Sequence, residues 1–292
     1  MIKTLIFILN HPCVKENRIN AFFRYFFWQL NRFFGINSKV FQFTSKTKLY
    51  AIRGIASSTG NYYCGLMEFN DMAFLLHSLD NNSLFIDVGA NIGSYSVLAS
   101  GEIGAKSICF EPVNNTHKML LDNLKLNFIE DLVETYKIGI GEKEQMIRIT
   151  NDRDSTNHII NQNDIGEEIN IKPLDFLITK IKKPTLIKID VEGYELNVLN
   201  GADKILNNKN VYGIIIEING LSKRYNVEEN LIHKKLVNYK FFPIKYHPLE
   251  RMAVKVKSFN KLNTIYIRDL ELINKKVKNS LKYKIGNFNF SI

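Results

Sequence analysis

From residue 84 onward, short apolar runs alternate along the chain with segments whose apolar residues recur at helical spacing. The runs that predict strands are SLFIDVG, AKSICFEP, LVETYKIGIG, TLIKIDVEG and YGIIIEING. Segments 115–127, 194–207 and 227–239 predict helices between them. Apolar, β-branched strands that alternate with helices are typical of sheets covered on both faces. We therefore expect an α/β fold with a mostly parallel sheet and helices on both faces.

The segment before this pattern is helical and strongly aromatic. In RINAFFRYFFWQLNRFFG, residues 18–35, helical spacing places Phe23, Phe26, Phe27 and Leu30 on one side, and the segment ends at Gly35. One interpretation is an interfacial helix that contacts a membrane or a lipid-linked substrate. The interpretation that we favour is a helix that packs this aromatic stripe on the domain.

Three parts of the chain follow from these patterns. We expect an N-terminal helical extension over residues 1–80, the α/β domain over 81–270 and a basic C-terminal tail over 271–292. Residues 58–79 read as a glycine-containing loop that enters a helix, and 142–170 as a polar excursion with one short strand, QMIRIT, and a loop.

Charge is unevenly distributed along the 292 residues. The net charge is +10, with +7 in residues 1–50 and +11 in residues 221–292, so that 51–220 carries +10 − 7 − 11 = −8. Basic ends can serve an anionic partner, but they also follow from a Lys-rich composition that keeps a protein soluble. Because no helix-turn-helix, RNA-binding or zinc-finger pattern accompanies the charge, we expect no nucleic-acid partner.

The cysteines and the apolar runs of the sequence indicate the cellular compartment. Cys13, Cys64 and Cys109 are far apart and odd in number, which favours a reducing compartment. The apolar run Leu5–Leu9 is shorter than a signal-peptide core, and no stretch approaches the ~20 apolar residues of a membrane span. We expect a cytoplasmic protein, either free or attached to the inner face of the membrane.

The stretch FIDVGANIGSYS, residues 85–96, has the outline of a nucleotide-binding loop. A dinucleotide loop would need glycine at 89, 91 and 94, whereas the chain has Gly89, Asn91 and Ser94. Asp87 would repel a diphosphate but attract the sulfonium and ammonium groups of S-adenosylmethionine. The carboxylate of that cofactor suits the N–H groups at the following helix N-terminus. The loop therefore favours S-adenosylmethionine over NAD.

Two further strand ends carry acidic residues. Glu111 stands 22 residues after Gly89, where a carboxylate accepts ribose hydroxyls in several cofactor classes, and Pro112 turns the chain out of the strand. In LIKIDVEGYE, Lys188, Asp190 and Glu192 share one side of a strand. The two acids could orient an acceptor hydroxyl, act as a base or bind a divalent cation. Alternatively, Lys188 pairs with a carboxylate in a buried network.

Together the motifs FIDVGANIGSYS, FEP, PLDFL, LIKIDVEGYELNVLNGA and IIIEIN resemble those of the FkbM-type methyltransferases, in the same order, over about residues 60–250. The resemblance implies a Rossmann-like class I methyltransferase domain that uses S-adenosylmethionine. It also implies that small residues near Gly139 lie close to the adenine. The cofactor-binding residues that we assign are Asp87, Gly89, Ala90, Asn91, Gly93, Tyr95, Ser96, Glu111, Pro112 and Gly139.

Members of that family mostly methylate hydroxyls of sugars or secondary metabolites, so the resemblance implies O-methylation. We expect the acceptor to be a saccharide hydroxyl of a cell-surface glycan or its precursor. An alcohol must lose its proton as the C–O bond forms. The residues that we assign to catalysis are His158, Asp190 and Glu192. Those that we assign to the acceptor are Glu68, Asp71 and Lys188. We assign no metal ligand, and leave metal dependence and oligomeric state open.

Three alternatives stay open at this point. An NAD-dependent oxidoreductase is opposed by Asn91 and Ser94. A non-catalytic glycan- or membrane-binding protein on a methyltransferase scaffold is opposed by the intact acids Asp87, Glu111 and Asp190. RNA methylation is opposed by the lack of an Asn-Pro-Pro-Tyr-like motif or a Pro-Cys pair.

Overall fold

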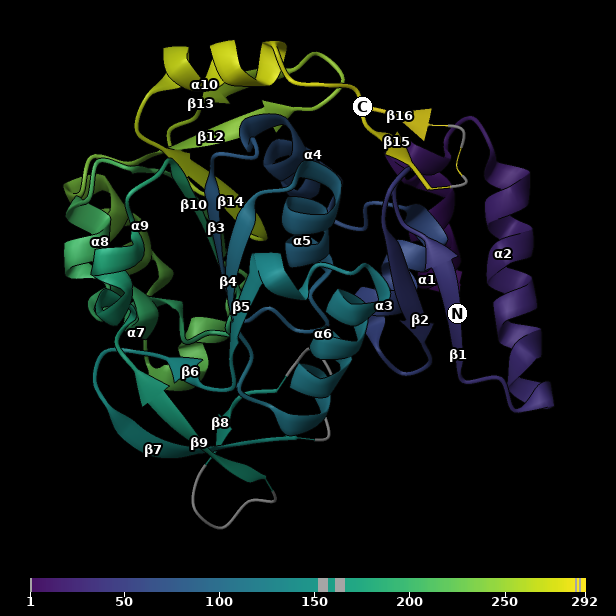
Figure 1. Ribbon diagram of the computed structural model, residues 1–292, viewed down its shortest axis with the longest axis horizontal. Coiled ribbons are helices and arrows are strands. Elements are labelled where there is room, and N and C mark those ends of the chain that lie inside the picture. Colours follow the sequence, from purple (N-terminus) through teal and green to yellow (C-terminus); the bar gives the residue numbers. More distant parts are fainter. Residues whose placement is uncertain (1, 152–156, 161–165, 287, 289) are drawn as a thin grey trace.

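The computed structural model covers residues 1–292 and describes all of them except 1, 152–156, 161–165, 287 and 289. A central eight-stranded sheet organises the molecule (Figure 1). Its strands in spatial order are β13 (Met252–Lys255), β12 (Phe242–His247), β14 (Asn263–Ile267), β11 (Val211–Glu217), β10 (Thr185–Ile189), β3 (Leu84–Val88), β4 (Lys106–Phe110) and β5 (Val133–Tyr136). β11, β10, β3, β4 and β5 are mutually parallel, whereas β14 is antiparallel to both neighbours. The expected α/β fold is confirmed.

Helices cover both faces of this sheet because side chains of each central strand are buried alternately on the two sides. Along β3, Phe85 enters one hydrophobic core, while Ile86 and Val88 enter the other. The first core is closed by α4 (Phe69–Ser78), α5 (Ser94–Ser96), the π-helix Val97–Ile103 and α6 (Asn114–Leu126). The second is closed by the 3₁₀ helix Leu174–Lys180, α7 (Glu195–Asn200), α8 (Asp203–Asn207) and α9 (Glu229–Asn238).

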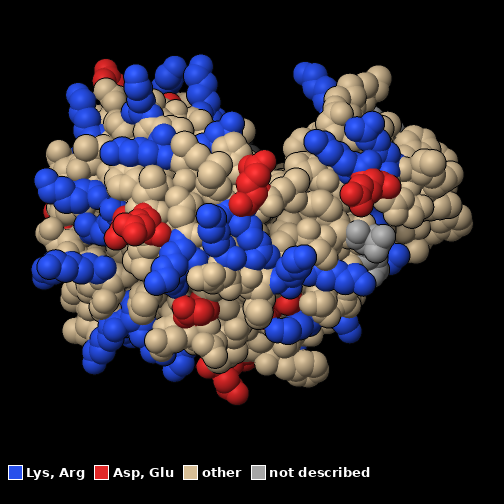
Figure 2. All heavy atoms as spheres, turned by 90° about the horizontal axis from the view of Figure 1, so that it is seen from above, with Lys and Arg blue, Asp and Glu red and all other residues tan. Residues whose placement is uncertain are grey.

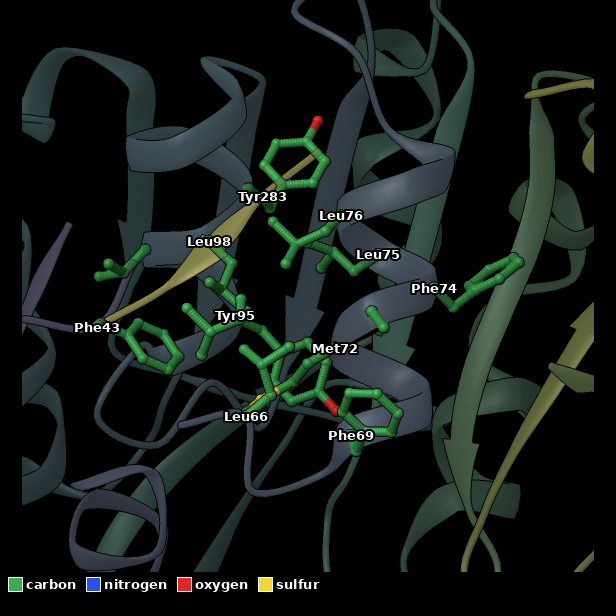
Figure 3. Close-up of a cluster of buried hydrophobic side chains, with 14 of the residues drawn as sticks. Phe43, Leu66, Phe69, Met72, Phe74, Leu75, Leu76, Tyr95, Leu98 and Tyr283 are labelled. Atoms are coloured by element: carbon green, nitrogen blue, oxygen red, sulfur yellow. The ribbon is translucent and has the colours of Figure 1, made fainter. Parts of the chain in front are cut away.

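The N-terminal segment shares the first core with the domain. It contains α1 (Ile2–Asn10), α2 (Arg18–Leu30), the hairpin of β1 (Ser38–Gln42) and β2 (Lys48–Ile52), and α3 (Ala56–Cys64). Figure 3 shows Phe43 and Leu66 of this segment among the side chains of α4 and the residues Tyr95 and Leu98. The prediction of a loop at the start of residues 58–79 is wrong, because these residues belong to helix α3 and a second helix, α4, follows.

The favoured packing of the aromatic stripe is also wrong. Helix α2 turns Ala21, Tyr25 and Trp28 towards the domain, and these side chains are buried. Phe23 and Phe27, which lie on the opposite side, are 46% and 56% exposed. Because α2 is aromatic on both sides, its spacing alone did not show which side packs.

Two other segments are more ordered than their composition indicates. The excursion after β5 forms a second sheet of β6 (Gly139–Ile140), β9 (Glu167–Lys172), β7 (Gln145–Ile149) and β8 (Ile159–Ile160), in that order, at the bottom of Figure 1. The C-terminal segment is folded onto the domain instead of forming a tail. Its helix α10 (Leu270–Lys278) packs on β13 and α4, and the hairpin of β15 (Lys284–Ile285) and β16 (Phe290–Ser291) follows.

Candidate active site

A cavity of about 280 Å³ opens where the parallel strands end. Its walls come from the loops after β3, β4 and β10, from the last residue of β11, from α3 and from the start of α4. Ligands of open α/β sheets bind at this edge. The sequence-assigned residues that line the cavity are Glu68, Gly89, Ala90, Asn91, Tyr95, Glu111, Pro112, Lys188, Asp190 and Glu192.

The loop after β3 is held tightly against the end of β10. Gly89 has a φ of 81°, and a Cβ atom at this position would lie 1.8 Å from the carbonyl oxygen of Asp190. Only glycine fits here, since the backbone conformation and the close approach both exclude a side chain. The Asn91 Oδ1 accepts the N–H of Ile92 at 2.8 Å and the hydroxyl of Ser57 at 2.9 Å. The loop is therefore fixed in shape and tied to α3.

Glu111 is a buried carboxylate at the cavity wall. Its Oε2 accepts the N–H of Asn91 at 2.9 Å, and its Oε1 accepts the N–H of Val113 at 3.0 Å. Burial raises the pKa of Glu111 to about 7, although these two backbone N–H groups oppose the shift. Each carboxylate oxygen retains a further lone pair. Glu111 can thus accept two hydroxyls from a ligand while it holds the loop.

Lys188 pairs with Asp190 in a buried network, as the alternative interpretation expected, and it also lines the cavity. Its assignment to the acceptor stays a prediction. Its Nζ lies 2.7 Å from Asp190 Oδ2 and 4.8 Å from the centre of the Tyr95 ring. Burial by itself lowers the pKa of Lys188, but the carboxylates of Asp190, Asp87 and Glu68 outweigh it and raise the pKa.

Asp87 lies behind the wall of the cavity. Its Oδ2 accepts the hydroxyl of Ser96 at 2.7 Å, and its Oδ1 has no hydrogen-bond partner within the described part of the chain. Burial raises the pKa of Asp87, and the charge of Lys188 opposes this. Gly93, Ser96 and Asp71 also lie outside the set of residues that line the cavity. Asp87 would therefore affect a bound ligand only indirectly, by way of the loop after β3 and of Lys188.

At the end of β10 and β11 three carboxylates meet. One oxygen from each of Asp190, Glu192 and Glu217 lies within 4.8 Å of the others. Burial raises the pKa of Glu192 to about 8, and the nearby charges of Asp190 and Glu195 add to this. Burial likewise raises the pKa of Glu217, whose Oε2 is buried and has no partner among the described residues. Such a cluster can accept hydroxyl hydrogens, share a proton or hold a divalent cation.

Glu217 was not among the sequence-assigned residues. It is the last residue of β11, in the motif IIIEIN, and lines the cavity. The signal that could have found it is the one used for Glu192, an acid that ends an apolar strand at the ligand-binding edge of the sheet.

His158 and Gly139 lie apart from the acids. They line a smaller adjoining cavity of about 50 Å³, whose other walls are mostly apolar side chains of the second sheet, including Ile147, Ile149 and Ile171. His158 therefore does not line the cavity that contains Asp190 and Glu192. Gly89 and Pro112 border both cavities, so the two form neighbouring parts of one ligand-binding region.

The model of the methyltransferase FkbM domain matches residues 87–241, more than half of the chain. The chain belongs to the FkbM methyltransferase family. Methyltransferase 1 of Beauveria bassiana is 26% identical over 161 residues, which are 46% of this chain and 64% of that protein, under two thirds of its length. The hexuronic acid methyltransferase AglP of Haloferax volcanii is 28% identical over 173 residues, which are 58% of this chain and 70% of AglP.

Solved structures with a similar fold include the S-adenosylmethionine-dependent methyltransferase of Agrobacterium tumefaciens, at 8% identity and a TM-score of 0.43, over 80% of this FkbM protein and 71% of that chain. SMU.1697c of Streptococcus mutans, solved in complex with S-adenosylhomocysteine, has 15% identity and a TM-score of 0.40, over 68% of this chain and 94% of that one.

The cofactor of this FkbM-family protein is S-adenosylmethionine, and the NAD alternative is therefore dropped. The residues present fit the cofactor. Gly89 leaves the backbone of the loop free of side-chain atoms, and Glu111 offers two acceptors for a ribose diol. The adjoining cavity is lined mostly by apolar side chains, which suits contact with part of an adenine ring.

Proposed function

We propose that this protein is an O-methyltransferase that modifies a saccharide hydroxyl, in a cell-surface glycan or its precursor. The observation that carries the proposal is the carboxylate cluster of Asp190, Glu192 and Glu217 at the cavity wall. Carboxylates accept hydrogen bonds from hydroxyls, which a saccharide presents in number. A relative named as a hexuronic acid methyltransferase supports a carbohydrate acceptor.

We assign the cofactor to the part of the cavity that the glycine loop and Glu111 form. When bound, S-adenosylmethionine supplies an electrophilic methyl group. Glu111 would accept the ribose hydroxyls, and the walls around Gly139 and Ile171 would contact the adenine. Glu68 and Asp190 both line the same cavity, where their carboxylates would favour a cationic centre.

Glu192 is the base that we propose. Burial and neighbouring negative charge raise the pKa of Glu192 to about 8, so its carboxylate is a stronger base than that of an exposed glutamate. Asp190 is held by Lys188 at 2.7 Å and would orient the acceptor hydroxyl. Glu217, with its pKa raised further, would stay protonated and donate to Glu192 or to the acceptor. The proton of the acceptor hydroxyl ends on a carboxylate oxygen of Glu192.

The experiment that tests this function is methyl transfer from labelled cofactor to a panel of mono- and oligosaccharides. We expect label in at least one saccharide, and we expect Glu192→Gln to bind S-adenosylhomocysteine normally while it loses transfer. If the protein binds S-adenosylhomocysteine but labels no saccharide, the proposed acceptor class is wrong. If no acceptor of any class is labelled, the non-catalytic alternative replaces it.

The place of action is part of the proposal. Within the described residues, no helix combines the length and the apolar character that crossing a membrane requires. We propose a cytoplasmic enzyme whose segment 18–35 contacts the inner face of the membrane, where lipid-linked saccharide precursors would be presented.

A further inference from the structure

Six exposed phenylalanine side chains lie on α2 and on the 3₁₀ helix Asn31–Phe34 that follows it. They are between 41% and 84% exposed, although phenylalanine is usually buried. We call them the aromatic surface: Phe22, Phe23, Phe26, Phe27, Phe33 and Phe34. Helix α1 packs against α2 and adds the exposed side chains of Ile2 and Ile6. An exposed apolar surface of this extent on a soluble protein marks an interaction site.

Four rings of the aromatic surface contact one another along α2. The rings of Phe22 and Phe26 stack with centroids 6.3 Å apart, those of Phe23 and Phe27 lie 6.0 Å apart, and Phe26 also contacts Phe27. On the other side of α2, buried Trp28 anchors the helix to the domain. The phenylalanines are therefore presented outward by a helix that is already fixed, and they need no rearrangement to meet a partner.

Positive charge surrounds the aromatic surface. Lys3, Lys15, Arg18 and Arg32 are exposed on or beside α1 and α2, and Glu16 is the only acid in residues 1–50. In Figure 2 the right-hand part of the molecule, where Figure 1 places these helices, has an uncharged outer edge with Lys and Arg side chains gathered beside it. An apolar face bordered by cations is typical of helices that lie in the interface of an anionic membrane.

We propose that the aromatic surface docks on an anionic lipid bilayer, with α1 and α2 lying in the plane of the interface. The 13 residues of α2 span about 20 Å, too short for the ~30 Å hydrocarbon core, so the helix would lie on the bilayer and not cross it. A second copy of the chain is a poorer partner. A two-fold interface would bring the cations of Arg18 and Arg32 towards those of the other copy.

The surface is connected to the active site through α3. Arg24 of α2 donates to the carbonyl oxygens of Tyr62 and Tyr63 in α3, and α3 contributes Ser57 and Asn61 to the wall of the cavity. Docking would therefore hold the N-terminal wall of the cavity near the membrane. This deepens the proposed function, on which it rests only for the identity of the lipid-linked acceptor.

Sedimentation with sucrose-loaded vesicles tests the docking without cofactor or acceptor. We expect the protein to bind vesicles of equimolar phosphatidylglycerol and phosphatidylcholine, and to bind phosphatidylcholine alone about tenfold more weakly. The variant Phe23→Ser/Phe27→Ser should lose about tenfold in binding. Arg18→Gln/Arg32→Gln should lose the preference for phosphatidylglycerol. The matched control is Phe128→Ser, because Phe128 is 91% exposed and lies outside the surface.

Three results would overturn the proposal. The wild-type protein could stay in solution with both kinds of vesicle, or the double serine variant could bind like the wild type. In analytical ultracentrifugation without lipid, a dimer that the serine variant dissociates would assign the surface to a second copy. Thermal unfolding at the wild-type temperature shows that the variants are folded. Since no methyl transfer is measured, the outcome is independent of whether the proposed acceptor is correct.

Discussion

The role that we propose for Glu111 can be tested with Glu111→Gln, which preserves the size of the side chain and removes its charge. Both carboxylate oxygens of Glu111 accept backbone N–H groups, at 2.9 and 3.0 Å, and each has one more lone pair for a ribose hydroxyl. Glutamine replaces one oxygen with an NH₂ group, which cannot accept. The loss of one hydrogen bond to a charged group is worth about 1.5–3 kcal/mol. We expect binding of S-adenosylhomocysteine to weaken about 10- to 150-fold.

The pH dependence of binding provides a second measurement on the same residue. Ribose hydroxyls donate to the carboxylate, so the cofactor favours the deprotonated form of Glu111. Because burial raises the pKa of Glu111 to about 7, the affinity of the wild-type protein should decrease as the pH falls below 7, by at most about tenfold per unit. In Glu111→Gln this dependence should be absent. Isothermal titration calorimetry at mildly acidic and mildly alkaline pH measures both effects.

Glu195→Gln is the matched control for this experiment. Glu195 is equally buried, accepts the N–H groups of Val191 and Gly193, and has a pKa that burial raises to about 7. It does not line the cavity. Both variants should lose similar thermal stability, but only Glu111→Gln should lose affinity. Wild-type affinity in Glu111→Gln, or equal losses in the two variants, would refute the assignment of the ribose to Glu111.

Three further predictions concern catalysis, the loop and stability. With S-adenosylmethionine saturating, kcat should increase with pH and show an inflection near pH 8, where Glu192 ionises. Asp190→Asn should move this inflection to lower pH, because the charge of Asp190 raises the pKa of Glu192. An unmoved inflection would exclude Glu192 as the base. Gly89→Ala should lower the free energy of unfolding in urea by at least about 2 kcal/mol, because φ is 81° and the new Cβ meets a carbonyl oxygen. The control Gly104→Ala has a φ of 83° but its nearest atom is 3.9 Å away, so its free energy of unfolding should decrease less. Equal decreases would mean that the contact with the carbonyl oxygen is unimportant. The melting temperature of the ligand-free protein should decrease as the pH is raised from about 5 to about 8. The raised pKa values of Glu111 and Glu192 make the folded state bind more protons than the unfolded state in that range. An increase in melting temperature over this interval would contradict the burial of these acids.

Several parts of the site could be predicted from sequence because they depend on local order along the chain. Apolar strands between helical segments specify a parallel sheet, and the carboxyl ends of such strands meet at one edge. An acid within a few residues of the carboxyl end of such a strand is therefore brought to that edge. This is why Glu111, Asp190 and Glu192 were found, and why Gly89 could be placed in the loop beside them.

What the tertiary structure decided is the direction in which side chains point. Asp87 lies within β3, one residue before its end, and Glu111 directly follows β4. Packing puts Glu111 on the cavity wall and Asp87 behind it, next to Ser96. Glu217 joins the acidic cluster only because β11 pairs with β10, which no local pattern specifies. The side of α2 that packs was undetermined for the same reason. Trp28 and Phe27 are alike in hydrophobicity, and only the shape of the surface beneath the helix selects one for burial.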